Sequence, residues 1–225
     1  MSGNLEFRKI TEELSNPDEQ AENVIRTLRR FRQRTIRQET CELCSAGLSQ
    51  NHRHLLEVSA GQIVCSCDPC ALRFQSVVGG RYKLIPQEVW YFPKFNLTDE
   101  EWEGLALPIN LAFFSYSTPE RRVKAFYPSP AGATESLLPL DTWNILVDRN
   151  PELKQMKADV EALLANRVRE PEYYILPIDL CFELVGLIRI NWRGFSGGEE
   201  AWKEVEAFFA RLKSSAKPLA KNPNS

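Results

Sequence analysis

Apolar runs in the second half of the chain predict β-strands. Residues 109–116 (INLAFFSY) and 123–127 (VKAFY) are rich in aromatic and branched side chains, and the polar segment STPERR joins them. Residues 160–166 and 173–176 form a second pair of the same kind. Short apolar runs separated by polar turns are typical of paired antiparallel strands. The pattern therefore predicts two strand pairs in this half of the chain.

A helix is expected after each predicted strand pair. Both helices start with a proline, an aliphatic residue and an aspartate, at Pro139–Asp141 and at Pro177–Asp179, and the two starts lie 38 residues apart. We expect Asp141 and Asp179 to cap the helices by accepting an unpaired backbone N–H. Two tandem strand–strand–helix units of this kind form one antiparallel sheet with helices covering a face.

The region before the second strand pair has an alternative interpretation. Residues 158–166 also fit a helical period, and Asn150-Pro151-Glu152 has the composition of a helix start. Under this alternative a helix runs on through Leu164 and replaces the strand at 160–166.

Two further helices are predicted, one from its capping residues and the other from its apolar stripe. Thr98 and Glu101 have the spacing of a capping box, and a short helix bearing Trp102 and Leu105 is expected to end before Pro108. Residues 199–213 place their apolar side chains on one stripe at helical spacing and predict the last helix.

The N-terminal segment predicts an amphipathic helix with a basic end. Asn16 and Pro17 suit the cap and the first position of a helix that we expect to reach about residue 37. Six arginines and no acidic residue lie between residues 26 and 37. We interpret them as a solvated helix face, and the alternative is a docking surface for an acidic protein.

A loop rich in proline and small residues interrupts the first strand–strand–helix unit at residues 128–136 (PSPAGATES). We expect an ordered loop between a strand end and a helix start. The main interpretation is a structural elaboration, and the alternative is a contact loop that uses Ser129, Thr134 and Glu135.

Composition narrows the class of protein. Of the 225 residues, 43% are hydrophobic and 26% charged, and the formal net charge is -2, as in an ordinary globular protein. This charge gives no reason to expect nucleic acid as a partner. No apolar run approaches the roughly 20 residues that a membrane span needs. The first residues contain acids and no apolar core of a signal peptide, so we expect a cytoplasmic protein.

The strongest chemical signal lies between Cys41 and Cys70, which enclose five of the six cysteines and both histidines. In a reducing compartment, clustered cysteines indicate metal ligands rather than disulfides. Two Cys-x-x-Cys pairs are present, and each can supply two thiolates to a tetrahedral ion. We therefore predict a metal site with these four ligands: Cys41, Cys44, Cys67 and Cys70.

The other metal-binding candidates in this stretch are left as alternatives. Cys65 is a spare thiol and an alternative ligand. His52 and His54 are possible substitutes, but we interpret His54, at the start of a strand, as a packed imidazole rather than a ligand. A closed four-thiolate site favours structural Zn2+, and the alternative is iron or an iron–sulfur cluster. Cys181 stands alone on a predicted apolar helix and is expected to be a core thiol.

The spacing of the cysteines also predicts the local fold. A knuckle at Cys41–Gly47 precedes an expected hairpin with strands at 54–58 and 62–65 and a turn at Ala60-Gly61. A helix after Cys67 carries the last ligands. This succession is that of a treble-clef or zinc-ribbon-like module, and residues 81–85 are a further strand candidate.

Several strings together resemble a known family: CELC, HRHLLEV, CSCDPC, FYPSPAGATES, PIDLCFELVGLIR and WRGFSGGEEAW. They are similar to an uncharacterised bacterial family, a domain of unknown function, over about residues 40–212. Genes of that family lie beside those of uptake nickel–iron hydrogenases. The resemblance implies an accessory or maturation role with a hydrogenase subunit or maturation factor as partner. It implies no catalytic residues, because none are established for the family.

Together these patterns predict an α+β protein in four parts. Residues 1–39 form an arm and a basic amphipathic helix, 40–80 a four-cysteine zinc module, 81–213 an α+β domain, and 214–225 a disordered tail. The expected function is that of a zinc-binding hydrogenase accessory protein acting by protein–protein contact, more a binding protein than an enzyme. The alternative function is a small electron-transfer protein with iron at the cysteines.

Overall fold

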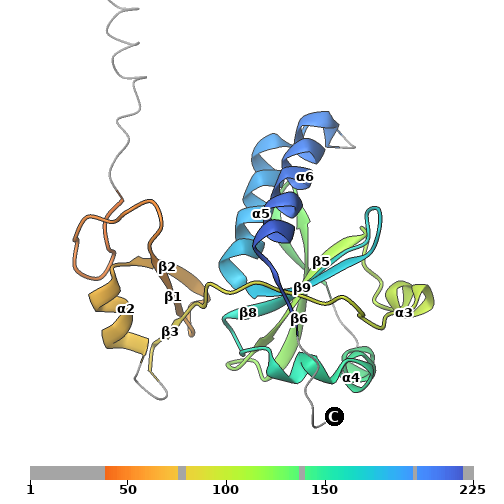
Figure 1. The fold of residues 1–225 in the computed structure, drawn as a ribbon, viewed down its shortest axis with the longest axis horizontal. Helices are drawn as coiled ribbons and strands as arrows, with labels where there is room; N and C mark the ends of the chain where they lie inside the picture. The colour runs from red at the N-terminus through yellow and green to blue at the C-terminus, as the bar shows by residue number, and fades with distance from the viewer. Residues whose placement is uncertain (1–38, 76–79, 137–139, 195–196, 220–225) are drawn as a thin grey trace, which may run out of the picture. The chain divides into compact units, whose positions relative to one another are not determined.

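The structure, a computed structural model, describes residues 39–75, 80–136, 140–194 and 197–219 (Figure 1). The chain divides into residues 1–39 and residues 40–225, and the helices and strands given below belong to residues 40–225. The predicted N-terminal helix with its arginine-rich end lies outside the described residues.

The second unit contains helices and strands in alternation. The strands are β1 (Arg53–Glu57), β2 (Gln62–Ser66), β3 (Tyr82–Leu84), β4 (Trp90–Tyr91), β5 (Leu111–Ser117), β6 (Arg122–Ser129), β7 (Gly132–Ser136), β8 (Glu161–Asn166), β9 (Glu172–Pro177) and β10 (Lys217–Pro218). The helices are α2 (Asp68–Gln75), α3 (Asp99–Gly104), α4 (Leu140–Arg149), the 3-10 helix η1 (Pro151–Gln155), α5 (Ile178–Asn191) and α6 (Gly198–Ser215).

Three short strands form a small antiparallel sheet in the order β2-β1-β3. In the β1–β2 hairpin, Leu55 lies opposite Val64, and both side chains are buried. Leu55 also lies opposite Leu84 of β3. The predicted hairpin and the strand predicted at 81–85 are confirmed. The third strand of this sheet comes after residue 80.

Seven strands form a second sheet in the order β10-β4-β9-β8-β5-β6-β7. The two predicted strand pairs, β5–β6 and β8–β9, lie side by side because β5 pairs antiparallel with β8. Helix α4 follows the first pair and α5 follows the second. The predicted α+β fold with two strand–strand–helix units in one sheet is therefore confirmed.

Helices cover both faces of this sheet, whereas we expected them on one face. Figure 1 shows α5 and α6 on one side of the sheet and α3 and α4 on the other. Along β5 the side chains alternate between the two layers: Phe113 packs in the cluster with α5 and α6, and Phe114 packs against Trp143 of α4. A continuous apolar run such as LAFF indicates a strand covered on both faces.

The alternative of a helix through Leu164 is wrong. Residues after Pro151 form only the short 3-10 helix η1, and β8 begins at Glu161. Asp159 has a φ of +72°, and its buried carboxylate accepts hydrogen bonds from the backbone N–H and the hydroxyl of Thr118 at 2.7 Å. A left-handed residue is incompatible with a continuing helix, so the chain enters the sheet instead.

The predicted aspartate caps are also wrong. α5 begins at Ile178, so Asp179 lies in its first turn and accepts a hydrogen bond from the backbone N–H of Leu180 at 2.9 Å. α4 begins at Leu140, so Asp141 also lies within its helix. An acidic residue in the first turn still complements the positive end of the helix dipole.

The predicted capping box at the start of α3 is confirmed. The backbone N–H of Glu101 donates to the hydroxyl of Thr98 at 3.2 Å, and the Glu101 carboxylate accepts from the backbone N–H of Thr98 at 2.9 Å. Trp102 is buried on this helix.

The expected loop at 128–136 is a hairpin. β6 continues to Ser129 and pairs with β7, and Gly132, with a φ of +123°, follows the two-residue turn. The proposed contact residues have internal partners: the Ser129 and Thr134 hydroxyls lie 3.0 Å apart, and Glu135 pairs with Arg122. The segment therefore extends the sheet.

The chain also remains regular beyond residue 213. α6 ends at Ser215, and β10 pairs in parallel with β4, so the described part of the predicted disordered tail forms structure. Among the described residues, no helix combines the length and the apolar character that crossing a membrane requires.

Candidate metal centre

Four cysteines predicted as ligands lie together in the structure. Their Sγ atoms all lie within 4.8 Å of one another, and those of Cys44 and Cys67 are 3.6 Å apart. A tetrahedral zinc ion with Zn–S bonds of about 2.3 Å places its sulfurs about 3.8 Å apart. The four side chains therefore form a group that can hold a metal ion of this size: Cys41, Cys44, Cys67 and Cys70.

A tight turn presents the first two cysteines. The backbone N–H of Cys41 donates to the carbonyl of Ala46, and that of Ser45 donates to the carbonyl of Cys41, both at 2.7 Å. Ser45 takes the left-handed conformation with a φ of +61°, and Thr40 and Gly47 form a β-bridge at the base of the turn. The knuckle predicted from Cys-x-x-Cys is thus formed, with Ser45 rather than Gly47 at the reversal.

The second pair lies where β2 passes into α2. Cys67 precedes the helix, and its carbonyl accepts the backbone N–H of Ala71 at 2.9 Å, while Cys70 lies in the first turn. Two hydrogen bonds join the two halves: the N–H of Glu42 donates to the carbonyl of Cys65 at 3.0 Å, and the N–H of Cys65 donates to the Glu42 carboxylate at 2.8 Å.

Two of the four thiols, Cys41 and Cys70, have pKa values shifted in opposite directions. Burial opposes ionisation of Cys41, but backbone N–H groups of Cys67, Leu43 and Cys44 donate to its sulfur and lower its pKa to about 6. Burial and the neighbouring thiols raise the pKa of Cys70 to about 12. The Cys41 thiolate thus forms readily, whereas ionisation of Cys70 is opposed. A bound cation removes this opposition, so metal binding releases protons.

The donor set determines what the centre can do. Four thiolates complete a tetrahedral shell and leave no position for water or substrate, which is the pattern of a structural site. Thiolates suit zinc and iron alike, so the donor set does not distinguish the two metals. We refer to residues 40–75 and 80–85, which carry this centre and the small sheet, as the cysteine module.

Cys65 belongs to a different group of side chains. Its sulfur and one ring nitrogen each of His52 and His54 lie within 4.8 Å of one another. His54 lies directly opposite Cys65 in the β1–β2 register, and His52 precedes it by two residues. The two imidazole rings meet edge to face, with centroids 4.8 Å apart. The role of Cys65 as an alternative ligand of the four-cysteine centre stays a prediction.

Oxygen atoms contact both histidines of this group. The Nδ1 atom of His54 lies 2.7 Å from a carboxylate oxygen of Asp179, and that of His52 lies 3.0 Å from the carbonyl of Ser49. The sequence offered a signal for the group itself, since His-x-His at the start of a strand lies near Cys65 across a predictable hairpin. It offered none for Asp179, which lies 125 residues from His54 in the chain.

Cys181 has the predicted position of a core thiol. It is fully buried in α5, and burial, together with the neighbouring charge of Asp179, raises its pKa well above the ordinary value. A thiol in these surroundings is protonated and unreactive at neutral pH.

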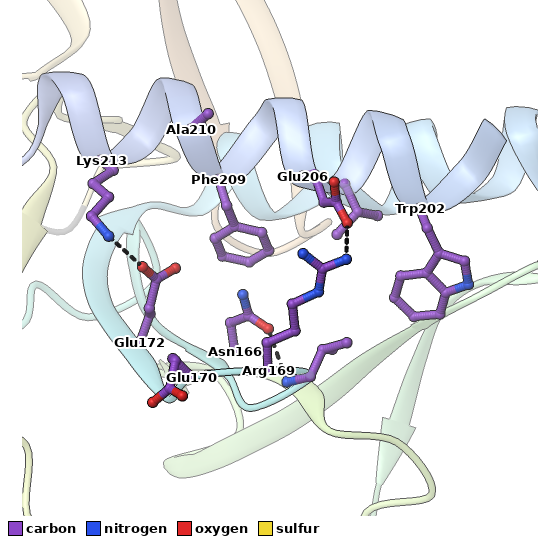
Figure 2. Close-up of a pocket in the computed structure, with 11 residues that line it drawn as sticks. Asn166, Arg169, Glu170, Glu172, Trp202, Glu206, Phe209, Ala210 and Lys213 are labelled. Carbon is purple, nitrogen blue, oxygen red and sulfur yellow. Dashed lines mark hydrogen bonds and ion pairs between the residues drawn. The ribbon is translucent and has the colours of Figure 1, made fainter. Parts of the chain in front are cut away.

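A groove lies elsewhere on the surface, between α6 and the turn that joins β8 to β9. Its volume is about 430 Å³. Figure 2 shows Phe209 and Trp202 pointing from α6 toward the turn, with the side chain of Arg169 between them. Ion pairs border the apolar centre: Arg169 with Glu206 at 2.5 Å and Lys213 with Glu172 at 3.1 Å.

The chain belongs to a family of unknown function, DUF5947, whose family model matches residues 40–216. No curated protein and no solved structure matches the chain. Membership confirms the predicted resemblance to an uncharacterised domain family. The match begins at the cysteine module and includes the whole seven-stranded sheet except its last strand, so both regions belong to the family's common part.

Proposed function

We propose that this member of the family of unknown function is a zinc-binding accessory protein in the maturation of a nickel–iron hydrogenase. It acts in the cytoplasm by contact with a hydrogenase subunit or another maturation factor. Zn2+ at Cys41, Cys44, Cys67 and Cys70 holds the cysteine module in shape, and the seven-stranded sheet carries a contact surface.

The four-cysteine group is the observation that carries this proposal. All four sulfurs converge on one point, so a metal there has a complete protein shell. A complete shell shapes the fold and offers no site for a reaction. A binding role therefore agrees better with this centre than a catalytic role.

The groove beside α6 supports contact with a protein. Its apolar centre includes Phe209 and the partly exposed Trp202. Positively and negatively charged side chains, joined in ion pairs, form its border. Interfaces have this distribution, with aromatic anchors inside a polar rim. The charged rim of Arg169 and Glu206 also gives a partner a defined orientation.

The sequence resemblance supports the link to hydrogenase. The strings that span both cysteine pairs and the start of α5 are similar to those of a family whose genes lie beside uptake nickel–iron hydrogenase genes. An accessory protein encoded there requires a protein partner and no active site of its own.

Metal analysis with partner capture tests the proposal. Tagged full-length chain, expressed in its own host and purified without chelator, is expected to be colourless, to hold zinc and to retain hydrogenase subunits or maturation factors. A coloured protein with iron at the four cysteines would favour the alternative of an electron-transfer protein. Normal hydrogenase processing in a strain that lacks the chain would contradict the accessory role.

Variants of the groove test where the partner binds. Trp202→Ala and Arg169→Glu are expected to reduce capture of the partner at least about tenfold, because aromatic and arginine side chains dominate interface energies. Ile190→Ala is the matched control, since Ile190 is an apolar side chain of α5 that is 70% exposed outside the groove. Equal loss of capture in the control would place the contact surface elsewhere.

A further inference from the structure

The group of His52, His54 and Cys65 has the donor atoms of a metal site separate from the four-cysteine centre. The three donors lie within 4.8 Å of one another, and the register of the β1–β2 hairpin holds two of them side by side. All three side chains are partly buried rather than freely solvated. Two imidazoles and one thiolate are a ligand set that divalent transition metals bind strongly.

The oxygen contacts fix the form of both imidazoles. A carbonyl oxygen only accepts hydrogen bonds, so the 3.0 Å contact to Ser49 requires that the Nδ1 of His52 carries the proton. The Asp179 carboxylate at 2.7 Å selects the same proton position in His54. In the neutral form each ring then has its lone pair on Nε2, and each is oriented by an acceptor at Nδ1. Histidines that bind metals have this support from a carboxylate or a carbonyl.

We propose that His52, His54 and Cys65 form a second metal site that binds one divalent transition-metal ion, with Zn2+ or Co2+ as suitable occupants. His52 and His54 bind through Nε2 and Cys65 through its thiolate, whose proton passes to solvent when the ion binds. Asp179 is a positioning residue that holds His54.

The second site differs from the first in being coordinatively open. Three protein donors leave a fourth position for water or for a donor from another molecule. The His54 side chain is 30% exposed, so solvent reaches this group, and the site lies where β1 meets the first turn of α5. An ion at this site is therefore more exchangeable than one enclosed by four thiolates.

Cobalt titration of the zinc-loaded full chain tests the proposal. Zinc is first loaded to one equivalent, which the four thiolates retain because they bind zinc more tightly than cobalt. Added Co2+ is then expected to bind at one further equivalent, with a thiolate-to-cobalt absorption band in the near ultraviolet and ligand-field bands in the visible range.

Variants assign the cobalt signal to residues. His52→Ala is expected to abolish the second equivalent, and Cys65→Ser to abolish the thiolate band, while both keep one zinc. Asp179→Asn keeps the hydrogen-bond acceptor for Leu180 but weakens orientation of His54, so the cobalt affinity should fall about 10–100-fold at unchanged stoichiometry. Cys181→Ala is the matched control, because Cys181 is a buried thiol that belongs to neither group.

Two results would overturn the proposal. One is a zinc-loaded chain that binds no further cobalt with a thiolate band. The other is a band that persists unchanged in Cys65→Ser or a second equivalent that persists in His52→Ala. Circular dichroism and retention of the first zinc verify folding of each variant, and if Cys65→Ser is insoluble, His52→Ala and Asp179→Asn decide the question.

Discussion

The cysteine module and the seven-stranded sheet hold their shapes by different means. The sheet is covered on both faces by apolar clusters that include large side chains such as Phe113, Phe114 and Tyr174. The buried side chains of the module are fewer and smaller. They are Cys41, Leu48, Leu55, Leu56, Val64, Ser66, Ala71 and Ile85.

This difference follows from size. A segment of a few dozen residues buries too little apolar surface to offset the entropy of ordering its chain. Small domains therefore use metals or disulfides as cross-links, and the four convergent cysteines can hold a metal ion that would serve that purpose here. The sheet needs no such cross-link, because its central strands β5, β8 and β9 are buried on both sides.

The module is nevertheless attached to the sheet. Leu56 and Ile85 belong to the same apolar cluster as α5 and α6. Polar contacts add to this junction: Lys83 lies 2.5 Å from the carboxylate of Asp159, and His54 contacts Asp179. The effects of substitutions within the module, within the sheet and at this junction can thus be measured separately.

The largest expected effect comes from removing the ligands of the four-cysteine centre. The double variant Cys41→Ser, Cys44→Ser should lose its zinc and the order of the module, since structural zinc contributes on the order of 10 kcal/mol to such folds. Hydrogen exchange measured peptide by peptide should show protection lost in β1 and β2 and kept in β5 and β8. Unchanged protection of β1 would mean that the module folds without metal.

A core substitution in the sheet should have the next largest effect. Phe113 is fully buried and stacks on Phe126 with ring centroids 5.2 Å apart, so Phe113→Ala should lower the free energy of unfolding by about 3–5 kcal/mol. Urea denaturation measures this loss, and zinc content should stay at one equivalent in the four-cysteine centre. Phe182→Ala is the control, with a smaller loss because Phe182 is 39% exposed. Loss of zinc from Phe113→Ala would show that the two regions depend on each other.

A substitution at the junction between the module and the sheet should lower the free energy of unfolding by less than the core substitution does. Asp159→Asn keeps a residue that tolerates the left-handed backbone but removes the charge that faces Lys83 and Thr118, at a cost of about 1–3 kcal/mol. Exchange protection in β3 should fall while β8 stays protected. Lys203→Met, which removes an exposed ion pair with Glu199, is the control and should leave β3 unchanged.

The smallest expected effect is at Cys181. Cys181→Ala removes one buried sulfur and should cost about 1 kcal/mol without changing the metal content. In the wild-type protein this thiol should resist alkylation until the sheet unfolds, because it is buried and protonated. Rapid labelling of Cys181 in folded protein would contradict its place in the core.

Local signals in the sequence predicted local structure well. The capping box of Thr98 and Glu101, the β1–β2 hairpin and the two Cys-x-x-Cys pairs depend on residues close in the chain, and each has the expected conformation or grouping. Contacts between distant segments were not predictable in this way. The sequence gives no sign that Asp179 faces His54, because that contact depends on how α5 packs beside the module.

The errors have the same physical origin. The 3.6-residue period at 158–166 was compatible with a helix, but pairing of β8 with both β5 and β9 outweighs that preference. The segment at 128–136 has the composition of a loop, yet the exposed edge of β6 accepts it as a strand. Propensity is a weak signal wherever sheet pairing is available.

The pair of hydrogen bonds between Glu42 and Cys65 has a consequence for the order of metal loading. Glu42 lies between Cys41 and Cys44 of the four-cysteine group, and Cys65 belongs to the proposed second site, so one backbone hydrogen bond and one carboxylate hydrogen bond couple the turn to the strand. If both centres bind ions, occupancy of either would fix these hydrogen bonds and remove part of the ordering cost of the other. The two affinities are then linked, and each ion strengthens binding of the other by the same factor.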